Sequence, residues 1–277
     1  MVALFTWGLK FGIDFTGGTQ MEVEFTKQVP NKNDLQKVLT PFKLNGLIMQ
    51  VIGNKGITLK YKNSDDKINV QIFKAIQKKY PDAKRKSVDF IGSSVSDQLK
   101  KNAIEAIILA IIGIALYITW AFRKVSRPVK SWKYGTGAII ALSHDVIITI
   151  GFFVLFGQYF GVEVGVPFIT ALLTILGYSV NDTIVVYDRI RENLTKASAK
   201  EDFEKVVNRS LNETLARSIN TSFTVIIVLL AVIFLGGSSI KFFAVALLIG
   251  VIFGTYSSIY IASALMVTSY KYQIKAK

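Results

Sequence analysis

The chain contains 277 residues, of which 51% are hydrophobic, and its formal net charge is +14. Its apolar residues come in long blocks and its mean hydropathy is positive, which excludes an ordinary soluble domain. The absence of cysteine excludes a disulfide framework and a thiolate metal site, and the positive charge is more typical of basic loops between membrane spans than of nucleic-acid binding.

The chain opens with the apolar stretch MVALFTWGL, residues 1–9. This stretch is too short to cross a bilayer, which takes a helix of about 20 residues. It is also too short for the hydrophobic core of a signal peptide. We therefore interpret residues 1–9 as the remnant of a first transmembrane helix, and we expect most of that helix to be missing from the chain.

Residues 10–101 have the composition of a soluble domain, and their periodicity alternates between the strand and the helix pattern. Asn31 is suited to cap the first helix, and Pro81 ends the second. The expected elements, in the order βαββαβ, are Thr16–Phe25, Asn31–Phe42, Leu47–Ile52, Ile57–Tyr61, Asp65–Tyr80 and Arg85–Ile91. This order predicts a small α+β domain of the ferredoxin-like type.

The segment GIDFTGGT at the start of this domain contains paired glycines, which also occur in phosphate-binding loops. It leads into a strand, and it lacks the strand-turn-helix context and the glycine spacing of a nucleotide-binding loop. We therefore predict no phosphate site in this segment.

Apolar segments that approach or exceed the length of a membrane span follow this domain. They cover about residues 103–122, 134–157, 165–186, 219–235 and 240–268. Residues 102–277 are therefore expected to form a five-helix transmembrane domain. In the last segment, GVIFG places Gly250 and Gly254 one turn apart, a pattern that predicts close packing against another helix.

The basic residues between the spans predict the orientation of the chain. They gather in the connections at 123–133 and 187–218 and in the C-terminal tail, whereas the alternate connections hold a single lysine. Basic connections normally stay in the cytoplasm, so we expect these regions to be cytoplasmic and the domain at 10–101 to be exterior. The residues concerned are Arg123, Lys124, Arg127, Lys130, Lys133, Arg189, Arg191, Lys196, Lys200, Lys205, Arg209, Arg217, Lys271, Lys275 and Lys277.

Polar groups interrupt two of the expected spans. His144 and Asp145 lie near the middle of the second, Asn181 and Asp182 lie in the cytoplasmic third of the third, and Arg217 opens the fourth on the same side. A carboxylate inside a membrane costs at least a few kcal/mol, so it normally faces the interior of a helix bundle or a wet cavity. Asp182 and Arg217 can form a proton relay or a static pair that fixes helix packing, and His144 with Asp145 leaves the same two interpretations open.

The same residues argue against an enzyme. One histidine and no cysteine make a catalytic metal site improbable, and no nucleophile motif supports proteolysis within the membrane. We therefore expect no catalytic residue, no metal and no cofactor.

Six motifs in the chain resemble, in order, those of the SecD/SecF family of protein-export membrane proteins, and within it the SecF branch. They are WGLKFGIDFTGGT, FIGSSVSDQLKKNAIEAI, ALSHDVIITIGFF, LLTILGYSVNDTIVVYDRIREN, SLNETLARSINTS and GGSSIKFFAVALLIGVIFGTYSSIYIASAL. The resemblance covers nearly the whole chain, and GYSVNDTIVVYDRIREN is the most specific part of it.

The resemblance implies a polytopic α-helical protein that forms half of a resistance-nodulation-division-type bundle, with SecD as the other half. It implies residence in the inner membrane and use of the proton motive force, without a cofactor, to help a translocating polypeptide through the SecYEG channel. It assigns the proton relay to Asp182 and Arg217, with His144, Asp145 and Asn181 as polar support. The other motif positions are Gly12, Asp14, Gly17, Gly18, Asp188, Arg189 and Arg191.

Other functions remain to be weighed against protein export. A proton-coupled efflux transporter of the same superfamily would need paired large exterior domains to enclose a small molecule, and about 90 residues form one compact unit here. A passive scaffold would tolerate the loss of Asp182 and Arg217 together. Nucleic-acid binding is disfavoured, because the lysines of the exterior domain are spread over its surface with few aromatic residues between them.

Overall fold

A computed structural model describes residues 2–62, 66–123, 129–198 and 201–275. The chain divides into two compact units, one formed by Phe11–Asn102 and the other by Met1–Lys10 with Ala103–Lys277. Some residues named above lie outside the described residues. They are Asp65, at the start of the second expected helix, and the basic residues Lys124, Arg127, Lys200 and Lys277.

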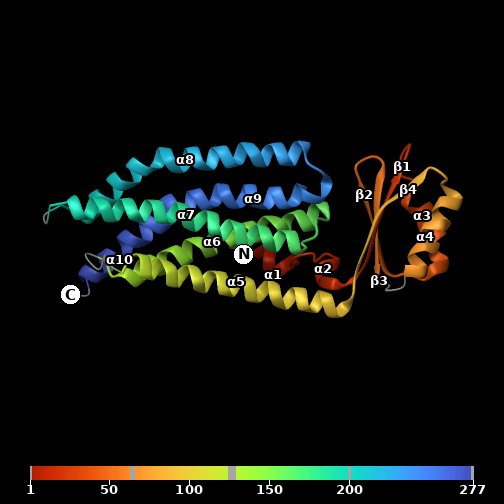
Figure 1. Ribbon diagram of the computed structural model, residues 1–277, viewed down its shortest axis with the longest axis horizontal. Helices are drawn as coiled ribbons and strands as arrows, with labels where there is room; N and C mark the ends of the chain where they lie inside the picture. The colour runs from red at the N-terminus through yellow and green to blue at the C-terminus, as the bar shows by residue number, and fades with distance from the viewer. Residues whose placement is uncertain (1, 63–65, 124–128, 199–200, 276–277) are drawn as a thin grey trace. The chain divides into compact units, whose positions relative to one another are not determined.

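The first unit, which we call the sheet unit, is built on an antiparallel sheet with the strand order β2-β3-β1-β4. Helices α3 and α4 lie on the same face of this sheet (Figure 1). The expected order βαββαβ is confirmed. The elements are α2 (Ile13–Thr16), β1 (Gly18–Phe25), α3 (Lys32–Leu39), η1 (Thr40–Phe42), β2 (Asn45–Ile52), β3 (Gly56–Lys62), α4 (Asp66–Lys79) and β4 (Ala83–Ile91).

Local sequence explains these elements. Burial alternates along β1, which places Met21, Val23 and Phe25 in one core with the apolar faces of α3 and α4. The Asn31 side chain caps α3 by accepting a hydrogen bond from the backbone N–H of Asn33 at 3.0 Å. One correction concerns the start of the first strand: it was expected at Thr16, but Thr16 is the last residue of the short helix α2, and β1 begins at Gly18.

The second unit, which we call the membrane unit, holds the long apolar helices. Within the described residues, five helices are long and apolar enough to cross a membrane, as expected from the sequence. Helices α7, α8 and α9 lie side by side (Figure 1). The elements are α1 (Val2–Trp7), α5 (Ser93–Ala121, which begins in the sheet unit), α6 (Ser131–Phe160), α7 (Val166–Lys196), α8 (Phe203–Leu235), α9 (Ser238–Tyr256), η2 (Ser257–Ala262) and α10 (Ser263–Lys275).

The polar connection expected at 187–218 is mostly helical. Helix α7 continues to Lys196, and α8 already begins at Phe203. The Asp202 side chain caps α8 by accepting from the backbone N–H of Glu204 at 3.2 Å. The hydropathy pattern therefore predicted the ends of the apolar segments, but the helices α7 and α8 extend beyond those ends.

The last span is not uniformly α-helical. Helix α9 passes directly into η2, a π-helical segment, and this into α10. A π-helical turn places an extra residue in the helix and often marks a functional site. Its buried residues include Ser257 and Ser258, which the next subsection describes.

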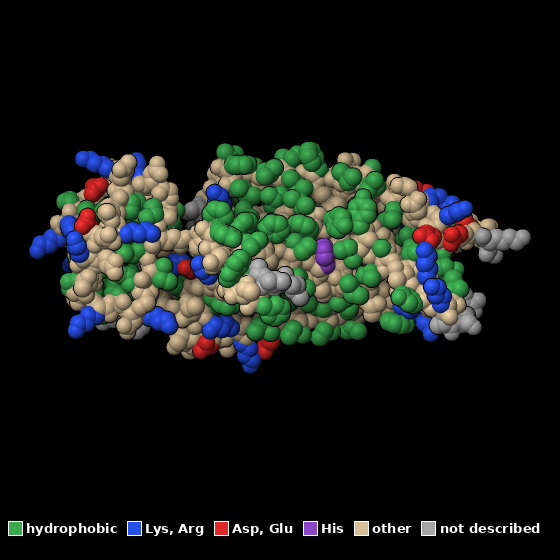
Figure 2. Space-filling model, turned by 180° about the vertical axis from the view of Figure 1, so that it is seen from behind, with side chains coloured by type: hydrophobic (Ala, Val, Ile, Leu, Met, Phe, Trp, Pro, Cys, Tyr) green, Lys and Arg blue, Asp and Glu red, His purple; other side chains and the backbone are tan. Residues whose placement is uncertain are grey.

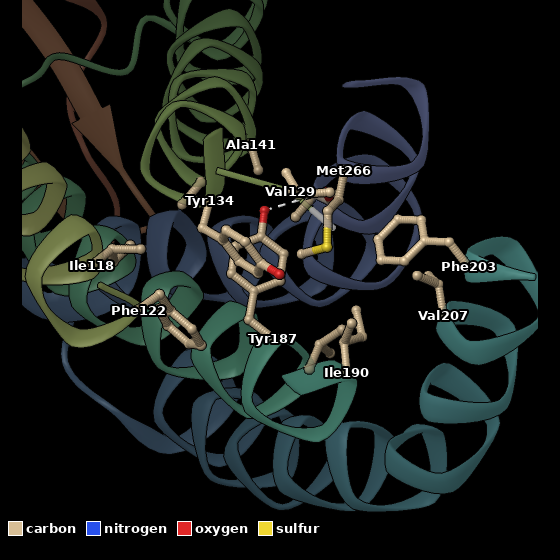
Figure 3. Close-up of a cluster of buried hydrophobic side chains, with 13 residues drawn as sticks. Ile118, Phe122, Val129, Tyr134, Ala141, Tyr187, Ile190, Phe203, Val207 and Met266 are labelled. Atoms are coloured by element: carbon tan, nitrogen blue, oxygen red, sulfur yellow. Dashed lines mark hydrogen bonds between the residues drawn. The ribbon is translucent and has the colours of Figure 1, made fainter. Parts of the chain in front are cut away.

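An aromatic cluster joins the helices next to η2. Phe122, Tyr134 and Tyr187 are buried, with the two tyrosine rings 5.3 Å apart and edge to face (Figure 3). The face of the membrane unit shown in Figure 2 is largely hydrophobic along its middle, and the single histidine lies within this apolar area. Such a surface is what contact with lipid requires.

Candidate functional site

Asp182 lies on the face of α7 that packs against α8, and its side chain is almost fully buried. The Ser218 hydroxyl donates a hydrogen bond to Asp182 Oδ1 at 2.6 Å. The other oxygen, Oδ2, is buried and has no hydrogen-bond partner among the described residues. A buried carboxylate oxygen without a donor is energetically costly, so this atom is a place where a proton, a water or a cation would bind.

A cavity of about 100 Å³ opens beside Asp182. A site for one water needs roughly 10–15 Å³ by the same measure, so several waters fit in this space. The cavity is lined by Tyr178, Asn181, Asp182, Val185, Arg217 and Thr221. The structure thus brings Asn181, Asp182 and Arg217 together, as the sequence led us to expect.

Arg217 does not touch the carboxylate. Its side chain is exposed, and no nitrogen of Arg217 lies within 4.0 Å of an Asp182 oxygen. It is the charged group whose field acts on Asp182 among the described residues. The expected partner is therefore close enough to attract the carboxylate and lines the same cavity, but no ion pair joins the two.

Asp145 has a different environment on α6. It is fully buried, and its Oδ2 accepts hydrogen bonds from the hydroxyls of Ser179 on α7 at 2.6 Å and Ser257 on η2 at 2.8 Å. Its Oδ1 lies 3.1 Å from Nδ1 of His144, whose side chain is 30% exposed. Both oxygens of this carboxylate therefore have partners, drawn from three elements.

The face of α7 that carries Ser179 also contacts the π-helical segment η2 at further points along the helix. The Ser258 hydroxyl bonds to Thr183 Oγ1 at 2.8 Å and donates to the backbone oxygen of Ser179 at 3.2 Å. One turn further along, the Tyr187 hydroxyl donates to the backbone oxygen of Ala262 at 3.2 Å (Figure 3). Residues spaced by four lie on one helical face, so α7 carries a polar strip that fits η2.

Sequence reasoning missed these hydroxyl groups. Ser179, Ser218 and Ser257 supply most of the hydrogen bonds to the two carboxylates, yet no motif singled them out. A signal was present in YSSIYIAS, residues 256–263, where serines interrupt an otherwise apolar span. Hydroxyls at membrane depth need partners, and a carboxylate elsewhere in the spans is a natural one.

The close packing predicted for GVIFG is confirmed. A Cβ added at Gly250 would overlap Ile175 on α7, and one at Gly254 would lie 3.1 Å from Ser179 Cβ and 3.6 Å from Asp145 Oδ2. The two glycines therefore let α9 approach α7 closely enough for the Asp145 hydrogen bonds to form.

The charged motif positions lie at the end of α7. Asp188 and Arg191 form an ion pair at 3.5 Å, whereas Arg189 bonds to Glu213 on α8 and to Glu192, each at 2.6 Å. These residues do not reach the Asp182 cavity. Of these contacts, the one between Arg189 and Glu213 joins α7 to α8.

The glycine motif lies in the sheet unit. Gly17 and Gly18 have φ angles of 68° and 121°, and a Cβ at Gly18 would lie 2.8 Å from the backbone oxygen of Tyr61. Gly12 precedes α2 and Asp14 lies within it. The geometry gives the glycine pair a steric role in the entry to β1, because only glycine tolerates these conformations and this close approach.

An exposed strip of small and polar residues runs along α7 and α8 beside the cavity. A polar strip at membrane depth is unfavourable against lipid tails and is typical of contacts between helices. Its exposed residues are Thr170, Thr174, Gly177 and Asn181 on α7 and Arg217, Asn220, Thr221 and Thr224 on α8.

Comparison with protein families gives two matches. Residues 71–272 match the C-terminal model of the protein export membrane proteins SecD and SecF, and residues 2–29 match the glycine-motif model of the same proteins. A curated relative, the protein translocase subunit SecF of Thermobaculum terrenum, is 44% identical over 96% of this chain and 86% of its own length. SecF of Haemophilus influenzae is 34% identical over 95% of this chain and 77% of its own length.

The solved structures lead to the same family. A crystal structure of SecDF, a translocon-associated membrane protein from Thermus thermophilus, superposes with a TM-score of 0.83 at 34% identity and matches 96% of this chain. A SecDF structure described as the super-membrane-facing form gives a TM-score of 0.66 at 33% identity. This chain spans only 35% and 36% of those two SecDF chains.

Proposed function

Because the chain belongs to the SecD/SecF family of protein-export membrane proteins, we propose that it is a multi-pass accessory subunit of protein translocation that binds protons at Asp182. The observation that carries the proton step is the buried Asp182 Oδ2, which has no donor among the described residues and belongs to a residue that lines a cavity large enough for several waters. In this proposal the chain performs no covalent chemistry and needs no metal or cofactor, because the proton gradient supplies the energy.

The mechanism is a competition between a proton and Arg217 for one oxygen atom. A proton on Oδ2 neutralises the carboxyl group and leaves Arg217 without an ion pair to it, as in the structure. Loss of that proton leaves a negative charge that attracts the guanidinium, which can bind a carboxylate at fixed geometry. Because Asp182 is on α7 and Arg217 on α8, each proton exchange changes the force between the two helices.

The energy available is adequate for such a switch. One elementary charge crossing 100 mV releases about 2.3 kcal/mol. That energy changes the ratio of two conformations about fiftyfold, since about 1.36 kcal/mol corresponds to a factor of ten.

The exposed strip on α7 and α8 is the surface we assign to the partner. A SecD-type half docked there would remove Asn181, Asn220 and Arg217 from lipid and close the cavity. The match to about a third of the SecDF chains supports the existence of such a second half, because those chains are much longer than this one. The two halves together would form the resistance-nodulation-division-type bundle.

The remaining partners follow from the proposed role. We assign the chain to the cytoplasmic (inner) membrane, with its C-terminus and basic connections in the cytoplasm and the sheet unit outside. There the sheet unit would meet a polypeptide leaving the SecYEG channel. Nucleic acid has no part in this proposal.

The decisive experiment replaces Asp182→Asn and measures export into inverted membrane vesicles with and without a proton motive force. We expect the variant to assemble with the SecD partner but to lose the stimulation of export by the proton motive force. Asp188→Asn is the matched control, because Asp188 lies on the same helix but is exposed and outside the cavity. Full stimulation by the Asp182 variant would exclude the proton step.

The same strains separate export from efflux. If the chain were a small-molecule transporter, Asp182→Asn would increase drug susceptibility and leave precursor proteins processed at the normal rate. We expect the opposite result, accumulation of precursors with unchanged susceptibility.

A further inference from the structure

We propose that Asp145 is a positioning residue that acts as a hydrogen-bond acceptor: it holds the π-helical segment η2 against α7 and does not carry a proton during the cycle. The inference rests on the proposed proton step at Asp182, but it concerns a different carboxylate on a different helix. It assigns a task to the π-helical turn of the last span, which the mechanism above does not use.

The hydrogen bonds of Asp145 are the first reason. Two hydroxyls converge on its Oδ2, at 2.6 and 2.8 Å, and the His144 ring faces its Oδ1 at 3.1 Å. The carboxyl group therefore joins α6, α7 and η2 at one point. A proton on Oδ2 would have to displace a serine hydroxyl, whereas the Asp182 Oδ2 has no hydrogen-bond partner among the described residues.

The continuation of this contact along α7 is the second reason. From Asp145, the contacts pass through Ser179, Thr183 and Tyr187, each of which bonds to η2 or to its end at Ala262. Thr183 is the residue next to Asp182. Fixing the register of η2 on this strip therefore also fixes the rotation of α7, and with it the direction in which Asp182 points.

The line of hydroxyls on the other side of the last span is the third reason. Thr255, two residues before Ser257, bonds to Ser222 on α8 at 2.5 Å. Ser222 in turn donates to the backbone oxygen of Ser218, the residue that bonds Asp182. The end of α9 thus contacts both carboxylate sites. A shift in the register of α9 would therefore disturb Ser218, the donor to Asp182, as well as α7, the helix that carries Asp182.

Few charged groups surround these sites. Among the described residues, His144 is the titratable group that acts on Asp145, and Arg217 is the charged group that acts on Asp182. Tyr256 of α9 faces the His144 ring at 6.5 Å between centroids. Among the described residues, no series of charged side chains connects Asp145 with Asp182. A substitution at Asp145 would therefore affect Asp182 through the packing of α7 against η2.

The proposal distinguishes two substitutions. In Asp145→Asn, the amide oxygen can accept both serine hydroxyls, while the amide nitrogen can donate to Nδ1 of His144 in its other neutral tautomer. In Asp145→Ala, the Ser179 hydroxyl loses its acceptor, and the Ser257 hydroxyl keeps only its bond to the backbone oxygen of Gly254 at 3.1 Å. A positioning residue therefore tolerates asparagine but not alanine, whereas a proton carrier tolerates neither.

The first readout needs no transport. Hydrogen exchange, followed by mass spectrometry on the SecD-bound chain in lipid nanodiscs, reports the protection of residues 254–262. We expect exchange in Asp145→Asn to stay within about twofold of the unsubstituted chain, and exchange in Asp145→Ala to rise about tenfold or more, the ratio that the loss of a hydrogen bond to a charged group supports. Equal protection of residues 254–262 in the two variants would overturn the proposed positioning role of Asp145.

The second readout is modification of Asp182 by a hydrophobic carbodiimide as a function of pH, located by peptide mapping. We expect the Asp145→Asn profile to match that of the unsubstituted chain and the Asp145→Ala profile to be displaced. If alanine prevents folding, Ser257→Ala, which removes one donor, takes its place and should displace the profile in the same direction by a smaller amount. An unchanged profile in both would overturn the positioning role.

Export by the same variants completes the test. We expect Asp145→Asn to keep most of the stimulation by the proton motive force. Loss of that stimulation with normal hydrogen exchange would make Asp145 a proton carrier and overturn the proposal. Failure of the proposed function would be recognised separately, because Asp182→Asn would then export normally while the exchange results for Asp145 still stood.

Discussion

The two buried carboxylates of the membrane unit differ in how completely their oxygens are paired. Asp145 has partners on both oxygens, whereas Asp182 has Ser218 on one oxygen and no partner among the described residues on the other. Both lie in apolar helices, so burial alone would assign them the same role. The pairing of the oxygens, and not the depth of the charge, is therefore the property on which we base the proposed proton site at Asp182.

The largest effect that would test this comparison is expected at Arg217. Arg217→Met removes the cation that competes with the proton, so we expect complete loss of stimulation by the proton motive force in the vesicle assay. Arg217→Lys keeps the charge but not the planar fork, and it should restore only part of the activity. Equal activity of the methionine variant and the unsubstituted chain would contradict the competition.

The next prediction tests the close packing of α9 against α7, which supports both carboxylate sites, at Gly250. Gly250→Val would overlap Ile175 and push α9 away from α7, at a cost of about 1–3 kcal/mol. The measurement is thermal unfolding of the purified chain in detergent. Gly177→Ala is the control, because an added Cβ there meets no atom within 4 Å, and it should unfold at the same temperature or higher.

Ser218 sharpens the contrast at Asp182 itself. Ser218→Ala removes the donor to Oδ1 and leaves both carboxylate oxygens without a partner among the described residues. A hydrogen bond to a charged group contributes about 1.5–3 kcal/mol, so we expect stimulated export to fall roughly tenfold. Ser218→Thr keeps the hydroxyl and should recover most of the rate; a threonine variant as poor as alanine would show that packing, not the bond, matters.

The smallest effect is expected in the aromatic cluster below η2. Tyr187→Phe removes the bond to the Ala262 backbone oxygen and should destabilise the chain by about 0.5–1 kcal/mol. Tyr134→Phe is the matched comparison, because its buried hydroxyl has no partner among the described residues and should cost nothing to remove. Thermal unfolding of the two variants in detergent checks which of them is less stable. A larger loss of stability for Tyr134→Phe than for Tyr187→Phe would contradict the prediction.

Much of this architecture could be predicted from the sequence, because each part depends on residues close together in the chain. Alternation in β1, the Asn31 cap and the apolar blocks of the spans are local patterns, and they appear where expected. Asp182 and Asp145 were recognisable for a similar reason, since a carboxylate within an apolar run has few harmless explanations.

The partners of the carboxylates could not be predicted in the same way. Ser257 lies 112 residues from Asp145, and Ser218 lies 36 residues from Asp182, so only tertiary packing brings them together. The π-helical turn has no strong local signature, because it depends on the fit between η2 and α7. Arg217 was correctly placed beside Asp182, but sequence spacing could not show that the two line a cavity without forming an ion pair.

The contacts at the charged end of α7 and α8 have a mechanical consequence. Asn193 donates to Ser210 at 2.9 Å and to Glu213 at 2.7 Å, so the two helices are tied at this level. Along α7, Asp182 lies about 16 Å from this tie and Val166 about 40 Å, at 1.5 Å per residue. If α7 and α8 pivot apart about the Asn193 contacts, a separation of about 1 Å at Asp182 becomes a separation of about 2.5 Å at Val166.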